Sequence, residues 1–262
     1  MLIISPFNPV WFGCLIGGFA ALGIATRLVR STSARFRENL IAGAMIFTFI
    51  CFWIYKYSVS IDMEYLQLRQ EAGLADEQFS WWLELCLHLC NINMILIPFA
   101  VKLKKRGLLF ITSVIGPLGA LAALLMPGIG FAGYSLLTGR VLGFYFTHLM
   151  VLFGGLSVIA FDLYTPSLCD VPKGLASLFL LNFVIFLFNI TVLSTGIETH
   201  ANYFYNMEPE GNPILELFYS WLPVPFLYTV FLLPIAAAWS YLFIWMVNRH
   251  PIPEATRLPA KP

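Results

Sequence analysis

Two histidines stand inside long apolar stretches of the sequence, His88 in one stretch and His148 in another. Imidazole changes its charge near neutral pH and often moves protons in enzymes. An ionisable side chain in apolar surroundings costs free energy, which makes such a residue a candidate for function. A histidine can instead donate a hydrogen bond that fastens two helices. Either role fits one histidine alone, whereas the pair favours a functional site.

Polar residues accompany His88 at helical spacing. Glu84 lies four residues before it and Asn91 three residues after it, so on a helix the three side chains share one face. Glu84 is then expected to orient the His88 ring. His88 and His148 are each the eighth residue of their apolar stretch, about 10–12 Å below the same edge. We therefore expect both imidazoles to reach one substrate.

Two cysteines flank His88, and the chain has five in all. Buried cysteine usually acts as a small apolar side chain, and a reactive thiolate needs a positive neighbour. On a continuous helix, Cys86 and Cys90 would each lie about 200° around the axis from His88. The sequence has no CxxC pair and no second Cys/His cluster at metal-ligand spacing. We expect no disulfide framework, no metal and no cofactor, and keep both cysteines as possible nucleophiles.

A later polar segment, residues 197–225, adds a third group of candidate side chains: Asn202, Tyr203, Tyr205 and Glu208. Tyrosines at a membrane boundary commonly form an interfacial belt. Because this segment is expected on the same side of the membrane as the two histidines, its side chains are also placed to cover their pocket. We expect them to support the site.

Composition defines the elements that carry these residues. Of 262 residues, 59% are hydrophobic and 11% charged, with a mean hydropathy of +0.80. A typical soluble domain has roughly 45–50% and 25%, so a soluble globular protein is excluded. The net charge of +1, without a long basic run, gives no footprint for nucleic acid. Membrane lipids are the expected substrate or ligand.

Seven stretches are apolar and long enough for a helix to cross a bilayer, which takes about 20 residues. The alternation typical of barrel strands does not occur. The sequence therefore predicts an all-α bundle of seven transmembrane helices in one domain over residues 1–262. The expected helices are Val10–Leu28, Leu40–Val59, Trp81–Val101, Leu108–Met126, Val141–Phe161, Leu175–Gly196 and Phe226–Val247.

Positive residues cluster on one side of these crossings. Twelve of the 15 Lys and Arg residues follow the first, third, fifth and seventh helices, and Lys56, Arg69 and Arg140 fall on the other side. Cytoplasmic connections retain Lys and Arg. The N-terminus is therefore expected outside and the C-terminus in the cytoplasm, with the histidine pocket in the outer-leaflet half.

Three short motifs carry a resemblance to a known family. They are Leu85-Cys86-Leu87-His88-Leu89-Cys90-Asn91, Phe146-Thr147-His148, and Asn202-Tyr203-Phe204-Tyr205 followed by Pro209. Together they resemble the YwaF-like bacterial integral membrane family, which looks like a distant relative of the transmembrane protein 164 acyltransferases. The resemblance implies a multi-pass protein of the bacterial cytoplasmic membrane. It also implies transfer of fatty acyl groups between membrane lipids by a Cys and a His.

One position departs from that pattern. In the eukaryotic relatives the catalytic cysteine immediately precedes the histidine of the third-helix motif, where this chain has Leu87. We therefore expect a lipid acyltransferase or transacylase in which His88 or His148 is the general base and Cys86 and Cys90 are dispensable.

The oxyanion of such a reaction needs a hydrogen-bond donor, for which Asn91 and Asn202 are the candidates. The alternative function is a transporter or binding protein for a small or lipid-like ligand. It would use the same histidine-lined cavity.

Overall fold

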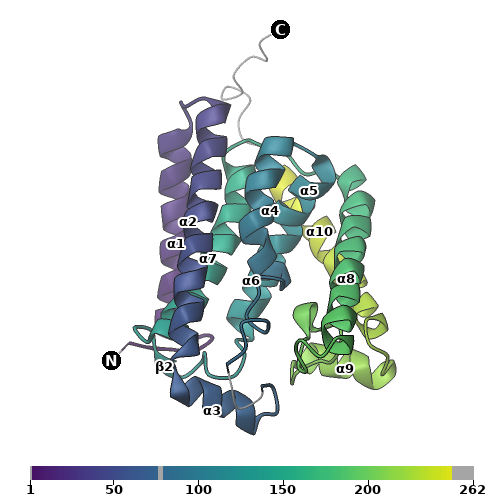
Figure 1. The fold of residues 1–262 in the computed structure, drawn as a ribbon. Coiled ribbons are helices and arrows are strands. Elements are labelled where there is room, and N and C mark those ends of the chain that lie inside the picture. The colour runs from purple at the N-terminus through teal and green to yellow at the C-terminus, as the bar shows by residue number, and fades with distance from the viewer. Residues whose placement is uncertain (1, 76–78, 250–262) are drawn as a thin grey trace.

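A computed structural model describes residues 2–75 and 79–249 as a bundle of helices (Figure 1). The helices are α1 (Pro9–Val29), α2 (Ala34–Ser60), α3 (Met63–Glu71), α4 (Leu89–Leu103), α5 (Arg106–Phe110), the π-helix η1 (Ile111–Ile115), α6 (Gly116–Leu125), α7 (Gly139–Ala160), η2 (Leu168–Asp170), α8 (Val171–Ser194), η3 (Tyr203–Tyr205), α9 (Pro213–Trp221), η4 (Leu227–Phe231) and α10 (Leu232–Arg249). A small antiparallel sheet pairs β1 (Ile3–Ile4) with β2 (Tyr134–Ser135), with Ile3 opposite Ser135.

Six helical stretches within the described residues are long and apolar enough to cross a membrane. They are Pro9–Val29, Ala34–Ser60, Arg106–Leu125, Gly139–Ala160, Leu168–Ser194 and Leu227–Arg249. Each overlaps one of the expected crossings, which confirms a multi-pass helical membrane protein. The expected third crossing contains only α4, an apolar helix of 15 residues, so the count of seven is not confirmed.

The prediction of a helix starting at Trp81 was wrong, because α4 begins at Leu89. The preceding residues form turns, with the Glu84 N–H donating to the Trp81 carbonyl. The cause is tertiary: Lys56 of α2 and Arg69 of α3 both bind the Glu84 carboxylate and hold this segment against their helices. Glu84 therefore does not share a helical face with His88.

The fourth crossing is not a uniform α-helix, since α5, η1 and α6 follow one another without a break. Pro117 stands at the start of α6 and has no backbone N–H to give to the preceding turn. A local π-helical adjustment is one way in which membrane helices satisfy the backbone groups that a proline leaves free.

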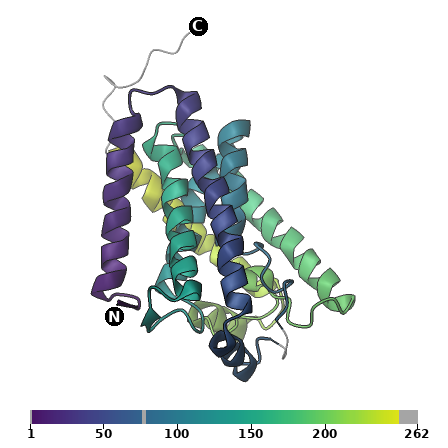
Figure 2. The same ribbon diagram turned by 60° about the vertical axis from the view of Figure 1, so that its left-hand side comes forward.

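Helices α2, α4 and α7 pack together, and α2 and α7 run side by side in Figure 2. A Cβ atom at Gly143 of α7 would lie 2.4 Å from side-chain atoms of Tyr55 in α2. A Cβ atom at Gly139 would lie 3.1 Å from Ser58. These two glycines therefore let α7 approach α2 closely.

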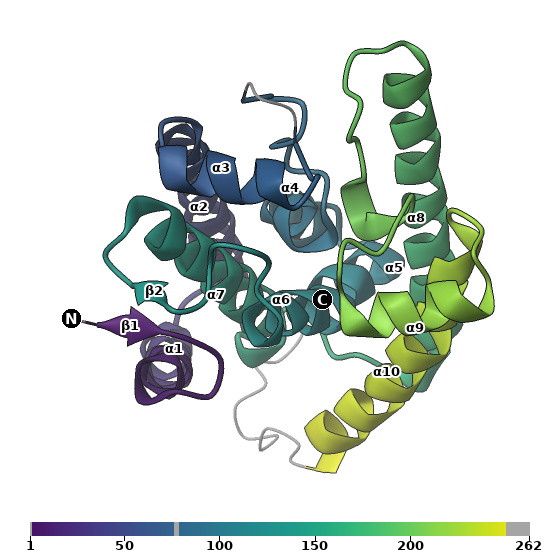
Figure 3. The ribbon, with the colours of Figure 1, turned by 90° about the horizontal axis from the view of Figure 1, so that it is seen from below.

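Helices α8, α9 and α10 form a second group, on the other side of α5 and α6 (Figures 1 and 3). α8 contacts α5, η3 and α10. The loop between α8 and α9 lies at the same end of the bundle as α3, the lower end in Figure 1.

The connections that carry most of the positive residues gather at the opposite end. The turn between α1 and α2, the turn between α4 and α5, the start of α8 and the end of α10 all lie at the top of Figure 1. The N-terminal strand β1, α3 and α9 lie at the lower end.

Candidate functional site

The thiol of Cys90 meets the imidazole of His148. The Cys90 Sγ lies 3.2 Å from the His148 Nε2, and the His148 Nδ1 lies 2.7 Å from the backbone carbonyl oxygen of Phe144. A carbonyl only accepts hydrogen bonds, so Nδ1 carries the proton and donates it. Nε2 is then the unprotonated nitrogen and accepts from the thiol. This is the tautomer that a cysteine nucleophile needs in its base.

The place of Cys90 at the start of α4 adds to this arrangement. Cys90 is the second residue of the helix, and the first helical hydrogen bond joins the Ile92 N–H to the His88 carbonyl. His88 stands at the N-cap position, but its side chain makes no capping bond. The backbone N–H groups of Leu89, Cys90 and Asn91 have no helical acceptor. Such a helix start favours negative charge, including that of a thiolate.

The surroundings of His148 hold its ring in place. His148 is buried in α7, and its ring centre lies 4.2 Å from that of Phe144. The Phe144 ring in turn stacks on Phe131, with centres 4.5 Å apart. The imidazole therefore has one fixed orientation, with Nε2 toward α4.

Glu84 forms a buried ion cluster instead of orienting His88. Its Oε1 accepts from Arg69 at 2.6 Å, and its Oε2 is paired with the Lys56 ammonium. Burial by itself lowers the pKa of the Arg69 guanidinium, but Tyr65 and Glu84 raise it above its ordinary value, so Arg69 stays charged. The expected role of Glu84 is therefore corrected to one of anchoring the segment before α4.

His88 contacts the loop between α8 and α9, as the sequence predicts. Its ring centre lies 5.0 Å from that of Tyr205 and 6.1 Å from that of Tyr203. Its Nδ1 is buried and has no hydrogen-bond partner in the described part of the chain. Because Cys90 follows two residues later and touches His148, the structure brings both histidines to the same end of α4.

The loop that carries Tyr203 and Tyr205 is built on α8. Asn189 of α8 is fully buried and accepts from the Tyr203 N–H at 3.1 Å, while its amide donates to the Tyr203 carbonyl at 2.9 Å. Phe204 and Tyr205 both have positive φ, at 63° and 53°. Such strain in residues other than glycine is retained only where surrounding contacts impose it.

Asn202 and Glu208 are used inside this loop. The Asn202 amide donates to the Glu208 carbonyl and to the Glu210 carboxylate, and its oxygen accepts from Met207 and Glu208 backbone N–H groups. Asn202 therefore has no donor free for an oxyanion, and the Glu208 side chain is exposed. Both residues support the loop without entering the Cys90 site.

The remaining candidates, Asn91 and Cys86, differ in how close they lie to the pair formed by Cys90 and His148, which we call the dyad. Asn91 is buried, and its Oδ1 lies 3.7 Å from the Cys90 sulfur. Cys86 packs on an apolar cluster that includes Phe52, and no contact with either histidine is found for it in the described residues. The two cysteines are therefore not equivalent.

Three residues of this region were missed by sequence reasoning: Lys56, Arg69 and Asn189. Lys56 and Asn189 each interrupt an otherwise apolar run of the sequence, which is a signal for a buried partner. The identity of the partner, by contrast, depends on contacts between residues far apart in the chain.

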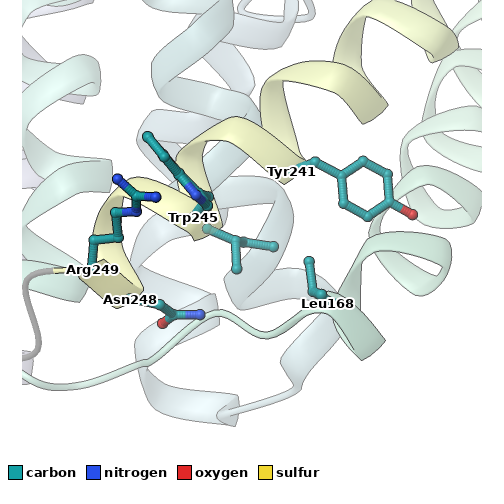
Figure 4. A pocket seen from close by; sticks show the side chains of 6 residues that line it. Leu168, Tyr241, Trp245, Asn248 and Arg249 are labelled. Atoms are coloured by element: carbon teal, nitrogen blue, oxygen red, sulfur yellow. The ribbon is translucent and has the colours of Figure 1, made fainter.

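A groove of about 420 Å³ lies elsewhere, along the end of α10 (Figure 4). It is lined by Leu168, Tyr241, Ile244, Trp245, Asn248 and Arg249. The Arg249 guanidinium lies 4.0 Å from the centre of the Trp245 ring. No histidine, cysteine or carboxylate is among these lining residues. Across residues 2–75 and 79–249 no group of three or more His, Cys, Asp and Glu side chains is placed to hold a metal ion.

Comparison with known families supplies one match. The model of the TMEM164 family matches residues 12–243, which is most of the chain. No curated protein and no solved structure matches it.

Proposed function

The chain belongs to the TMEM164 family, and we propose that it is a membrane-embedded lipid acyltransferase or transacylase. In this proposal Cys90 is the nucleophile and His148 its general base. The observation that carries it is the 3.2 Å contact between the Cys90 Sγ and the unprotonated His148 Nε2. The thiol and its base lie together at the start of a helix, whose first N–H groups have no helical acceptor.

The first half-reaction follows from this geometry. The Cys90 thiol gives its proton to the His148 Nε2, and the thiolate attacks the carbonyl carbon of a lipid ester. The oxyanion that forms takes hydrogen bonds from backbone N–H groups at the start of α4. The bond to the ester oxygen then breaks, and the leaving alcohol takes the proton from His148. The acyl group remains on Cys90 as a thioester.

The second half-reaction returns the enzyme to its starting state. An acceptor hydroxyl loses its proton to a base and attacks the thioester carbonyl. The bond to sulfur breaks, the thiolate recovers a proton, and the acyl group leaves as a new ester. No cofactor, oxidant or reductant is needed.

This proposal replaces the mechanism expected from Leu87. That expectation placed both cysteines on one continuous helix with His88 and compared their angular positions around the helix axis with that of His88. Since α4 begins at Leu89, the relevant partner of Cys90 is His148 on another helix. Leu87 therefore does not exclude a cysteine mechanism, and Cys90 is no longer expected to be dispensable.

We also propose the arrangement in the membrane. The turns before α4 and α4 itself make a seventh crossing, the positive end of the bundle faces the cytoplasm, and the membrane is the bacterial cytoplasmic membrane. Support comes from the connections that follow α1 and α4, whose Lys and Arg residues lie in segments at the upper end of Figure 1. A reporter active only in the cytoplasm should give signal when fused after Pro262. Signal from a periplasmic reporter alone would contradict this orientation.

The activity is tested with purified protein in liposomes that contain an isotope-labelled diacyl phospholipid and an unlabelled lysophospholipid. Mass spectrometry should find the label in a new diacyl lipid with wild-type protein and not with Cys90→Ala. Cys86→Ala is the matched control and should transfer the label normally. Wild-type liposomes whose lipids stay unchanged would contradict the proposal and direct attention to transport.

A further inference from the structure

Two buried polar atoms beside the dyad have no partner in the described residues: the Nδ1 of His88 and the hydroxyl of Tyr203. Tyr203 is only 1% exposed. The two rings come from segments more than a hundred residues apart and face each other with centres 6.1 Å apart. An unsatisfied buried polar atom costs free energy, and native proteins keep few of them. Two such atoms on neighbouring rings indicate a place for a polar ligand group.

The chemistry of these atoms selects the ligand group. A tyrosine hydroxyl can donate a hydrogen bond, and an unprotonated imidazole nitrogen accepts one. With the His88 Nδ1 unprotonated, as a general base requires, a group that satisfies both atoms at once accepts from Tyr203 and donates to His88. An alcohol hydroxyl does both, whereas an ester carbonyl can only accept.

His88 has a ring nitrogen available to bind such a hydroxyl, whereas His148 does not. The two ring nitrogens of His148 are engaged with Phe144 and Cys90. The His88 ring neither caps α4 nor pairs with Glu84, whose oxygens are taken by Lys56 and Arg69. His88 nevertheless lies close to Cys90, which follows it by two residues at the start of α4.

We propose that His88 and Tyr203 form the acceptor site, where they bind the hydroxyl that attacks the Cys90 thioester. The inference rests on the proposed function and assigns its two half-reactions to different histidines. Tyr203 donates to the acceptor oxygen and orients it. His88 takes the hydroxyl proton as the oxygen bonds to the thioester carbon. The carbon–sulfur bond breaks with its electron pair on sulfur, and the proton held by His88 passes to the Cys90 thiolate, which restores the thiol beside the unprotonated His148 Nε2.

Tyr205 lies beside this site. Its ring centre is 5.0 Å from that of His88, and its side chain is 37% exposed. The contact is made by a short loop segment, η3, rather than by a transmembrane helix.

The test separates the half-reactions in full-length protein held in nanodiscs. A diacyl phospholipid is added first, and intact-mass spectrometry follows the acyl adduct on Cys90. A lysophospholipid is then added, and loss of the adduct measures transfer. We expect His88→Gln to acylate within about twofold of wild type and to lose the adduct on the order of a hundredfold more slowly. Tyr203→Phe should slow transfer about tenfold.

Three controls keep the result specific. Tyr145→Phe removes another buried hydroxyl without a partner, but Tyr145 packs in a separate apolar cluster, so both half-reactions should stay unchanged. Hydroxylamine needs no base to cleave a thioester, and it should release the adduct equally fast from every variant. A lysophospholipid analogue without its free hydroxyl should release none.

The outcomes distinguish this inference from the proposed function. Wild-type protein without an adduct on Cys90 would overturn both. An adduct that forms and then transfers at the wild-type rate in His88→Gln would overturn the acceptor site alone. Equal slowing of acylation and transfer in Tyr203→Phe would also overturn it, because it would show a structural role.

Discussion

His148 and His88 lie near the same end of the bundle in opposite environments. His148 stands within the long helix α7, and its two nitrogens are bonded to groups of the protein. His88 stands where turns give way to α4, contacts a strained loop, and has a buried nitrogen without a partner. The first histidine is positioned by regular structure. The second has an environment that a substrate can complete, which is the difference expected between a fixed base and a binding group.

The largest effect is expected at His148, which the regular helix α7 positions. His148→Ala removes the base that accepts the Cys90 proton and should lower acyl transfer about 10²–10⁴-fold, measured by labelled lipid in liposomes. The control is Thr147→Val, one residue away. Within the described residues, the Thr147 hydroxyl bonds to carbonyls of its own helix, at Gly143 and Phe144. Similar losses in both variants would show that helix α7, and not the imidazole, is what matters.

The second large effect is expected in the stability of the fold, at the segment before α4 that carries His88. Glu84→Gln leaves the buried Lys56 and Arg69 cations without a carboxylate, which should lower the free energy of unfolding by about 3–5 kcal/mol. The measurement is unfolding in detergent. Glu64→Gln is the control, because Glu64 is an exposed partner of Arg140 and should cost about 1 kcal/mol or less. Equal costs would mean that the Glu84 cluster does not anchor the segment before α4.

The smallest effect is a stabilising one at the end of α7. Asp162 follows the helix with a positive φ of 56° and is exposed. Asp162→Gly should stabilise the fold by about 0.4–1 kcal/mol, since glycine adopts this conformation without strain. Asp162→Ala should give no such gain. Activity should not change in either variant, because His148 is already fixed, and a change in activity would show that α7 is less rigid than the comparison requires.

The apolar stretches were enough to predict the helical bundle, because burying apolar surface in lipid requires long helices wherever such runs occur. The start of α4 was not predictable in the same way. Trp81–Val101 reads as one continuous run, but Glu84 binds two cations from other helices. Contacts over such distances in the chain override local periodicity.

The candidate site was likewise predictable only where it depends on positions along the chain. His88, Tyr203 and Tyr205 do meet, and the sequence led us to expect them at the same end of the helices. The pairing of Cys90 with His148 could not be derived from positions along one helix, since it depends on how α4 packs against α7.

The most direct test of the account is the chemical identity of the intermediate. Full-length protein is mixed with a labelled diacyl phospholipid without acceptor, digested, and mapped by mass spectrometry for acylated residues. The account predicts a label on Cys90 that hydroxylamine removes at neutral pH, as a thioester requires. It predicts at least about a hundredfold less label in His148→Ala. Undiminished acyl transfer by Cys90→Ala, or a label on another residue with Cys90 unmodified, would contradict it.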